Sequence, residues 1–166
     1  IDPLTNLKNR RGLDEALDEE IQRAERSGNG FGVIWLDIDH FKSINDQLGH
    51  QAGDEILCRV ALWLKAGVRP YDHPGRWGGD EFVILLAPCD LLTLEHVARR
   101  VRETVEQESR KTGTPVTISV GGYFSKPGDN IDTVLRNADK ALYHAKNEGR
   151  NRVCIGRPED TEINPT

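Results

Sequence analysis

The sequence has no methionine, only three cysteines and no long hydrophobic run. Cys58, Cys89 and Cys154 are scattered without CxxC spacing, which argues against disulfides and structural zinc and favours a reducing compartment. No apolar stretch approaches the ~18 residues that a membrane-spanning helix needs, and no signal peptide is visible. We therefore expect a cytoplasmic chain. Because it starts at Ile1 without methionine, we also expect a longer parent protein, whose upstream sensor, regulatory domain or membrane anchor lies outside this sequence.

An excess of positive charge is also missing. The 22 lysines and arginines against 27 aspartates and glutamates give a net charge of −5 and a pI of about 5.6. This balance argues against binding to duplex nucleic acid, but a single nucleotide needs only a local patch and a metal. The 166 residues suffice for one domain with its own core. We expect that domain to span residues 1–156, followed by a polar tail over residues 157–166 with two prolines.

Hydrophobic periodicity and turn residues predict an alternation of helices and strands. The expected helices are one that starts at Asn9 or Asp14 and ends near Arg26, a short one capped by Asp39, and residues 52–65, 92–109 and 131–147. The expected strands cover residues 31–38, 71–77, 81–86, 115–124 and 151–155. Because two strands form a direct hairpin, the order indicates an α/β (α+β) fold. Its mixed, largely antiparallel sheet is flanked by helices and is not doubly wound.

Two glycines meet two carboxylates at the centre of the predicted hairpin, Gly78-Gly79-Asp80-Glu81. Both glycines can adopt positive φ at the centre of a tight turn. Acidic side chains at a sharp turn can reach a divalent metal, and glycines beside them let a ligand approach the backbone. Taken alone, the motif fits equally well a polar hairpin whose acids face solvent.

A second acidic pair, Asp37 and Asp39, lies at the end of an otherwise apolar strand. The two side chains share one face because strand side chains repeat every two residues. Buried acids are costly unless a cation compensates them, and Mg²⁺ favours one or two carboxylates together with phosphate oxygens. Asp39 could instead cap the helix that follows. Asp37 has no such structural explanation, so we interpret it as a metal ligand, with Asp80 and Glu81 as candidate partners.

Four segments resemble, in order and spacing, the GGDEF family of diguanylate cyclases. Residues 2–11 (DPLTNLKNRR) resemble the opening motif, with Asn6 where glycine is usual. Residues 37–54 (DIDHFKSINDQLGHQAGD) resemble the central motif, and residues 78–82 (GGDEF) are the signature itself. Residues 139–151 (DKALYHAKNEGRN) resemble the closing motif. The resemblance extends over about residues 2–155. It implies a fold similar to that of nucleotidyl cyclases and polymerase palm domains.

The resemblance implies roles for individual residues. It implies that Mg²⁺, or Mn²⁺, is held against the triphosphate of GTP by four groups: the carboxylates of Asp37, Asp80 and Glu81 and the carbonyl of Ile38. It implies that Asn45 and Asp54 read the guanine edge through amide and carboxylate hydrogen bonds. The implied phosphate contacts are the backbone around His40, Phe41 and Lys42 and the side chains of Lys146 and Arg150. Lys42 is also a candidate for stabilising the transition state.

Each of these roles has a structural alternative. Asn45 and Asp54 could cap helix ends. Lys146 and Arg150 flank a helix C-terminus, where cations are favourable in any case. The family spacing favours the functional interpretation at all four positions.

The resemblance also implies the reaction. Two GTP molecules condense to cyclic di-GMP and two pyrophosphates, as each 3′-hydroxyl attacks the α-phosphorus of the other GTP. Because one domain holds one GTP, catalysis requires a homodimer. Arg69-Pro-Tyr-Asp72 matches the spacing of the family's inhibitory product site, with Arg100 as a candidate second arm. The alternative for Arg69 and Asp72 is an ordinary surface ion pair.

Three other functions compete with this one. A degenerate domain would bind GTP or cyclic di-GMP as a regulatory module without catalysis, but such domains usually lose signature acids, and here all are present. An enzyme that makes mixed cyclic dinucleotides is disfavoured by Asp54, since a small hydroxyl residue there would relax guanine selection. A pure dimerisation domain would leave the acids unexplained.

Overall fold

The computed structural model describes residues 1–157, so all but the first residue of the predicted C-terminal tail lies outside the described residues. The helices are α1 (Arg10–Ser27), α2 (Phe41–Leu48), α3 (His50–Ala66), α4 (Leu91–Lys111) and α5 (Ile131–Asn147). The strands are β1 (Phe31–Ile38), β2 (His73–Gly78), β3 (Glu81–Leu86), β4 (Ile118–Ser125) and β5 (Val153–Ile155). Their order along the chain is the predicted one, and most ends lie within three residues of the expected positions.

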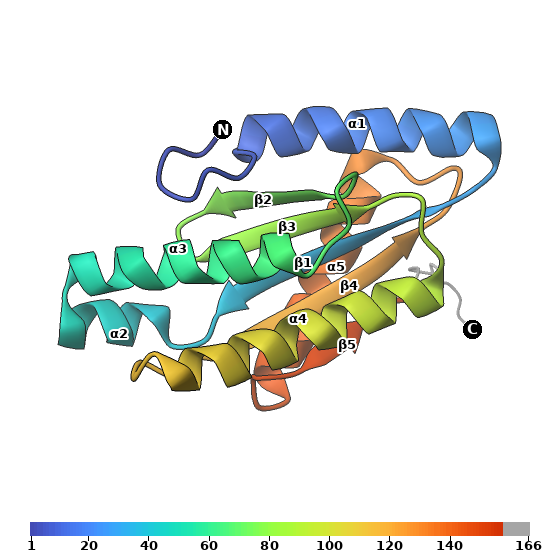
Figure 1. The fold of residues 1–166 in the computed structure, drawn as a ribbon. Coiled ribbons are helices and arrows are strands. Elements are labelled where there is room, and N and C mark those ends of the chain that lie inside the picture. The colour runs from blue at the N-terminus through green and yellow to red at the C-terminus, as the bar shows by residue number, and fades with distance from the viewer. Residues whose placement is uncertain (158–166) are drawn as a thin grey trace.

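The five strands form one sheet in the order β2-β3-β1-β4-β5 (Figure 1). Every neighbouring pair is antiparallel except β4–β5, which is parallel. β1 lies at the centre and is buried along its whole length, as its nearly continuous apolar sequence predicts. The structure thereby confirms a mixed, largely antiparallel sheet.

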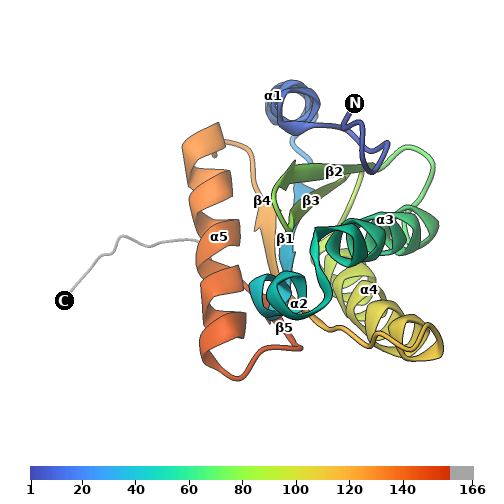
Figure 2. The same cartoon turned by 90° about the vertical axis from the view of Figure 1, so that its left-hand side faces the viewer.

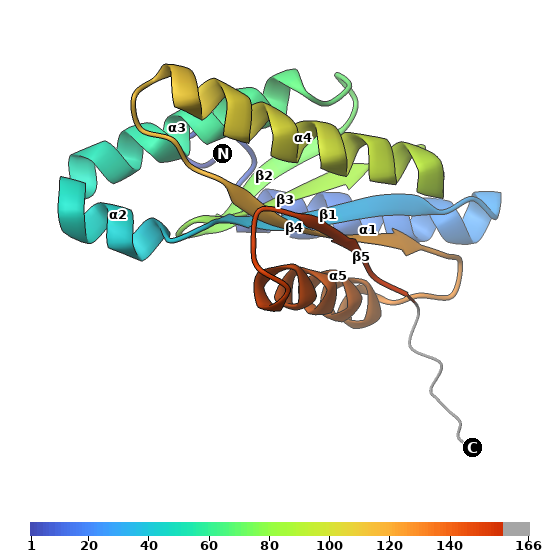
Figure 3. The same ribbon diagram turned by 90° about the horizontal axis from the view of Figure 1, so that it is seen from below.

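Helices cover both faces of the sheet (Figures 2 and 3). One core cluster joins the even-numbered side chains of β1, such as Ile34 and Leu36, to α3 and α4. The other joins the odd-numbered ones, such as Val33 and Trp35, to α1 and α5. Asp37 is next in the odd series, so its carboxylate belongs to the face that α1 and α5 cover.

Local signals set the helix ends. The Asn9 side chain accepts a hydrogen bond from the Gly12 N–H at 2.9 Å, so Asn9 caps α1 and the alternative cap, Asp14, is wrong. α1 ends at Gly28, whose φ of 77° is left-handed. A single residue, Gly49, separates α2 from α3, and α3 therefore starts at His50, earlier than predicted.

The N-terminal segment packs against the β2–β3 hairpin. Asn6 has a φ of 61°, a left-handed conformation that asparagine tolerates better than most residues, which explains why it can stand where the family has glycine. The Asp2 carboxylate pairs with Arg76 at 3.3 Å, and the Arg76 Nε donates to the Gly79 carbonyl at 2.9 Å. These contacts tie the first residues of the chain to the signature turn.

The cysteines and the helix lengths bear on disulfides and on membrane spans in the described part of the chain. Cys58, Cys89 and Cys154 form no disulfide, and burial raises the pKa of the Cys89 thiol to about 11. Among residues 1–157, no helix has the length and apolarity to cross a bilayer.

Candidate active site

The candidate site lies where β1 and β3 end beside the signature turn. Asp37 and Glu81 are direct partners in the antiparallel register of these strands. Side chains opposite each other on antiparallel strands stand about 5 Å apart at Cβ, and two like charges there repel unless a cation lies between them. The Lys146 ammonium group, from the last turn of α5, contacts the Asp37 carboxylate. The fold therefore brings together two acids and one base from three distant parts of the sequence.

The signature turn is shifted by one residue from the predicted position. Gly78 pairs with Glu81 in the ladder, so the central residues of the turn are Gly79 and Asp80. Of the two glycines only Gly79 has a positive φ, 51°, and the expectation of positive φ at both is wrong. The cause is an irregularity in β2 between Arg76 and Gly78, which shifts the register by one residue. Asp80 consequently lies in the turn itself, and Glu81 begins β3.

Burial makes the charged forms of these acids costly. Burial raises the pKa of Asp37 to about 6, although the contact with Lys146 opposes this shift. Burial also raises the pKa of Asp80, and the nearby positive charges of Lys146 and Arg76 oppose it. The negative charges of Asp80 and Asp39 further disfavour ionised Asp37. Such a site gains stability from any cation that enters it.

The residues present fit a hard divalent cation only in part. Within residues 1–157, no group of three or more His, Cys, Asp or Glu side chains is arranged to hold a metal ion. The buried Asp37 and its strand partner Glu81 nevertheless offer carboxylate oxygens, which Mg²⁺ and Mn²⁺ prefer. Mg²⁺ usually combines one or two carboxylates with substrate phosphates and water rather than a complete protein cage. Two carboxylates are therefore what this edge of the sheet offers to a hard cation.

The N-terminus of α2 follows Asp37 directly and offers donors for phosphate. His40 precedes the helix in a left-handed conformation, with φ 58°, and its side chain forms no capping hydrogen bond. The first N–H groups of a helix, here those of Phe41 and Lys42, have no partner within it, and they attract anions. The Lys42 side chain is exposed.

A second part of the site lies between α2 and α3. The Asn45 Oδ1 atom is buried without a hydrogen-bond partner, which is uncommon for a native polar group. It packs against Gly53 of α3 so closely that a Cβ at position 53 would lie 1.8 Å from it. Asp54, the next residue, is exposed. Gly49 occupies both the C-cap position of α2 and the N-cap position of α3, and no side chain makes a capping hydrogen bond at the start of α3. The alternative that Asn45 and Asp54 cap helix ends is therefore wrong.

Asp39 has a role that the sequence did not reveal. Its carboxylate accepts hydrogen bonds from the Thr117 and Ser119 hydroxyls, each at 2.6 Å, and from the Asn151 N–H at 3.0 Å. The prediction that Asp39 caps α2 is therefore wrong, because His40 occupies the cap position. Asp39 instead joins the end of β1 to β4 and to the loop after α5. The alternation of hydroxyls at Thr117 and Ser119 was the one signal that could have indicated this.

The loop after α5 is held by the same network. Arg150 and Asn151 both have left-handed φ angles, 65° and 47°. The Arg150 N–H donates to the Ala145 carbonyl, which ends the helix next to Lys146. Lys146, in the last turn of α5, and Arg150, in the loop that follows, thus lie close together along the chain. Lys146 contacts Asp37, a contact that its alternative role of stabilising the helix C-terminus does not require.

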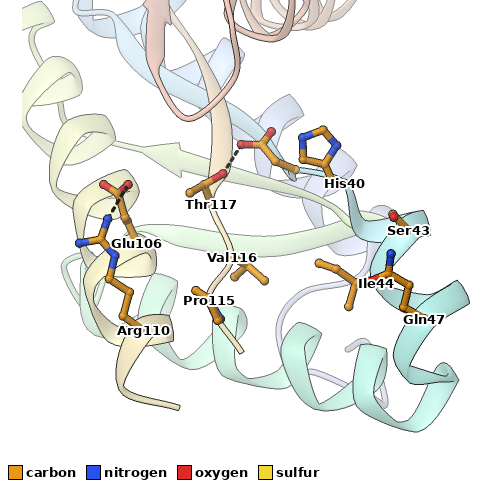
Figure 4. A pocket seen from close by; sticks show the side chains of 10 residues that line it. His40, Ser43, Ile44, Gln47, Glu106, Arg110, Pro115, Val116 and Thr117 are labelled. Atoms are coloured by element: carbon orange, nitrogen blue, oxygen red, sulfur yellow. Dashed lines mark hydrogen bonds and ion pairs between the residues drawn. The ribbon is translucent and has the colours of Figure 1, made fainter. Parts of the chain in front are cut away.

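A cavity of about 380 Å³ lies beside α2 (Figure 4). Its walls come from α2, the end of α4 and the segment before β4: Asp39, His40, Ser43, Ile44, Gln47, Glu106, Arg110, Pro115, Val116 and Thr117. Of the predicted site residues only His40 lines it. This cavity is therefore separate from the place where Asp37 and Glu81 meet.

The predicted inhibitory site forms a compact cluster at the far end of the hairpin. Arg69 donates to both carboxylate oxygens of Asp72, from Nε at 3.0 Å and from Nη2 at 2.9 Å, and to the Pro88 carbonyl at 2.7 Å. The Asp72 side chain is 0% exposed, so the pair is not an ordinary surface ion pair. Arg100 reaches the same loop through the Gly67 carbonyl, at 2.7 Å.

Removing the Asp37 charge is expected to change how stability depends on pH. The Asp37 carboxyl, with a pKa of 3.8 in the unfolded chain and about 6 in the folded one, binds a proton more readily in the folded state. Protonation of Asp37 therefore stabilises the fold fully below pH 4, and this stabilisation is lost as pH rises through 6. In metal-free buffer at pH 7.5, Asp37→Asn should raise the free energy of unfolding by about 1–3 kcal/mol. Urea titrations with chelator should show this difference shrinking towards pH 4; a difference independent of pH would contradict it.

Comparison with known proteins identifies the class to which this fold and site belong. The chain matches the family described as diguanylate cyclase, GGDEF domain, over residues 1–152. The chain belongs to the GGDEF-domain family.

Curated relatives and solved structures agree with this assignment. The bifunctional diguanylate cyclase/cyclic di-GMP phosphodiesterase MucR of Pseudomonas aeruginosa is 40% identical over 160 residues, which cover 93% of this chain and 23% of MucR. Diguanylate cyclase DosC of Escherichia coli is 38% identical over 157 residues, covering 92% of this chain and 34% of DosC. The chain thus spans about a quarter to a third of these relatives.

Two crystal structures are similar over most of the chain. The GGDEF domain of DgcB from Caulobacter crescentus, in complex with c-di-GMP, has a TM-score of 0.87 and 35% identity, and covers 93% of this chain and 91% of its own. Diguanylate cyclase SiaD of Pseudomonas aeruginosa, in complex with its activator SiaC, has a TM-score of 0.89 and 40% identity, over 93% of this chain and 61% of its own.

Proposed function

We propose that this chain is a metal-dependent diguanylate cyclase domain that condenses two GTP molecules to cyclic di-GMP and two pyrophosphates. Family membership and relatives named diguanylate cyclases support this activity. The observation that carries the proposal is the pairing of Asp37 with Glu81 across β1 and β3, with Lys146 against Asp37. Two opposed carboxylates with a half-buried ammonium group beside them suit a metal-bound triphosphate.

The proposed metal ligands are the carboxylates of Asp37, Asp80 and Glu81 and the carbonyl of Ile38. When bound, Mg²⁺ or Mn²⁺ would lower the pKa of an attacking hydroxyl and offset charge on the phosphates. Lys146 would exchange its contact with Asp37 for the phosphates, and Arg150, on the same loop, would add a second cation. The N–H groups at the start of α2, from His40 to Lys42, would bind phosphate oxygens, and the Lys42 ammonium would face the charge that develops as pyrophosphate leaves.

The guanine base is proposed to lie between α2 and α3. The buried Asn45 Oδ1 atom lacks a hydrogen-bond partner there, and it packs closely against the bare backbone of Gly53. The exposed Asp54 carboxylate can accept from the N1–H and N2–H₂ groups of guanine, which adenine cannot offer in the same pattern. Asn45 and Asp54 would therefore select GTP.

The reaction needs two chains. One site holds one GTP, and each 3′-hydroxyl must attack the α-phosphorus of a nucleotide held by a second copy. We propose that two domains meet face to face as a homodimer, which the upstream sensor or regulatory domain expected from the sequence would bring together. A reaction that consumes GTP suits the cytoplasm, where GTP is made and cysteines stay reduced.

Product analysis at several protein concentrations tests the function directly. The purified protein with GTP and Mg²⁺ should yield cyclic di-GMP and pyrophosphate in a 1:2 ratio by mass spectrometry, and the rate per molecule should rise with protein concentration. Binding of GTP without product would indicate a regulatory module. Mixed dinucleotides from equal GTP and ATP would refute guanine selection, and a rate per molecule that stays constant would contradict assembly of the dimer during the assay.

A product-binding site is proposed at Arg69, Asp72 and Arg100. The cluster lies at the opposite end of β2 from the signature turn, and a strand of six residues spans about 20 Å. Product bound there could restrain the domain pair without competing with GTP. Because both Asp72 oxygens are engaged by Arg69, a ligand would contact the exposed part of the Arg69 guanidinium and Arg100 first.

The buried ion pair changes how this site must be tested. Arg69→Ala alone should lower the free energy of unfolding by about 3–5 kcal/mol, because the Asp72 carboxylate stays buried without its partner. The double variant Arg69→Ala/Asp72→Asn should recover much of that loss and show no inhibition by added cyclic di-GMP, at an initial rate within about twofold of the parent.

Denaturant unfolding and initial-rate assays measure both effects. Arg59→Ala is a matched control, since the Arg59–Glu55 pair is exposed and should matter by less than ~1 kcal/mol. If cyclic di-GMP inhibits the double variant as strongly as the parent, Arg69 and Asp72 have only a structural role.

A further inference from the structure

A tryptophan on β1 holds one oxygen of Glu81. The Trp35 Nε1–H donates a hydrogen bond of 2.8 Å to Glu81 Oε1. Trp35 pairs with Val83 and Asp37 pairs with Glu81, so Trp35 and Glu81 are diagonal neighbours on the same face of the sheet. Trp35 is only 8% exposed, which shields this bond from water.

The indole ring of Trp35 is in turn packed against a second tryptophan. Trp77 packs against it with ring centroids 5.1 Å apart and planes at 54°. The guanidinium of Arg10, the first residue of α1, lies 4.3 Å from the centre of the Trp77 ring. Trp77 occupies the irregular position of β2, between Arg76 and Gly78, which is where the shift in the turn originates. Three elements therefore set the direction of one N–H group.

The hydrogen bond from Trp35 opposes the repulsion that the strand register creates between two carboxylates. Asp37 and Glu81 stand opposite each other, and repulsion would turn the freer Glu81 side chain towards solvent. A hydrogen bond from a buried donor to a carboxylate is stronger than one between neutral groups and restricts the side-chain torsions. Accepting this one hydrogen bond leaves Oε1 a second lone pair, so both oxygens of Glu81 can still bind a cation.

We propose that Trp35 is a positioning residue that keeps the Glu81 carboxylate beside Asp37, with Trp77 and Arg10 holding its indole. The proposal rests on the proposed function, since it gives Glu81 a part in binding metal and nucleotide. Trp35 itself touches no reacting group. Its effect is to keep one ligand oriented before substrate arrives, as the partners of metal ligands do in general.

Two matched substitutions separate orientation from packing. Trp35→Phe keeps an aromatic ring against Trp77 but removes the donor, and it should lower kcat about 10- to 100-fold and raise the Mg²⁺ concentration for half-maximal rate. The KM for GTP should stay within about threefold. Trp77→Phe also removes an indole, but Trp77 forms no side-chain hydrogen bond among residues 1–157, so its kcat should stay within about twofold of the parent.

A spectrum of the metal-free protein tests the contact without any reaction. The chain has three tryptophans, hence three indole N–H signals in a ¹H–¹⁵N spectrum, which single Phe variants of Trp35, Trp63 and Trp77 assign. Glu81→Gln should shift the Trp35 signal several-fold more than the other two, and the Trp35 N–H should exchange most slowly with deuterium.

The outcomes separate this inference from the proposed function. Equal shifts of all three indole signals, or equal loss of kcat in Trp35→Phe and Trp77→Phe, would overturn the positioning role. A parent protein that binds GTP and Mg²⁺ but makes no product would refute the proposed function, and the response of the Trp35 signal to Glu81→Gln would then decide the inference alone.

Discussion

Asp37→Asn is expected to lower the rate of cyclic di-GMP formation at least about 100-fold, the usual cost of removing one preorganised charged or polar group from a transition state. Its carboxylate lies at the buried end of β1, 10% exposed, opposite Glu81 and in contact with Lys146. The amide has nearly the same shape but cannot compensate a cation. Rates with GTP across a range of Mg²⁺ concentrations measure the loss, and excess metal should not restore it.

Two further measurements make this result specific. Asp46→Asn, at an exposed acid of α2 outside the site, should leave the rate within about twofold. The metal-free Asp37→Asn protein should be no less stable than the parent, because burial already disfavours the charge of Asp37. An inactive and destabilised variant would suggest a structural role, and near-parental activity under saturating metal would mean that Asp37 is not a ligand.

Asp54→Ser is expected to lower the preference for GTP over ATP by about 10- to 100-fold, since a hydrogen-bonded pair matched to a base edge contributes about 1–3 kcal/mol of discrimination. Asp54 is exposed next to Gly53 on α3, so its replacement should leave stability nearly unchanged. Competition assays with both nucleotides measure the ratio. Glu55→Ser, which removes the neighbouring acid on the same helix, is the matched control and should keep the parental ratio.

Gly53→Ala tests the same site without altering a charge. A Cβ at position 53 would lie 1.8 Å from Asn45 Oδ1, so the amide must leave its place between the helices. We expect weaker GTP binding together with a loss of discrimination, in the same direction as Asp54→Ser. An unchanged GTP-to-ATP ratio in both variants would place guanine recognition elsewhere.

The sequence predicted the elements and their order because those depend on local patterns. Apolar spacing at Leu13 and Leu17 marks α1, and the continuous apolar run of β1 marks a central strand buried on both faces. The direct hairpin excluded a doubly wound sheet. The spacing of four motifs was sufficient to suggest the family, which the match over residues 1–152 confirms.

The errors fall where distant residues compete with local signals. Asp39 stands where a helix cap is expected, yet hydroxyls 78 and 80 positions away take its carboxylate. The centre of the turn is Gly79-Asp80 and not Gly78-Gly79, because the register of β2 is irregular between Arg76 and Gly78. Asp72 follows a turn, but the fold buries it under Arg69.

The sequence by itself determined which acids, amides and bases this protein has and which elements hold them. Only the tertiary structure decided which of them meet. Strand register placed Asp37 opposite Glu81, and the packing of α5 brought Lys146 to Asp37. The pairing of β1 with β3 gave Glu81 its tryptophan donor. Register and packing depend on the burial of whole faces, a property that no short motif contains.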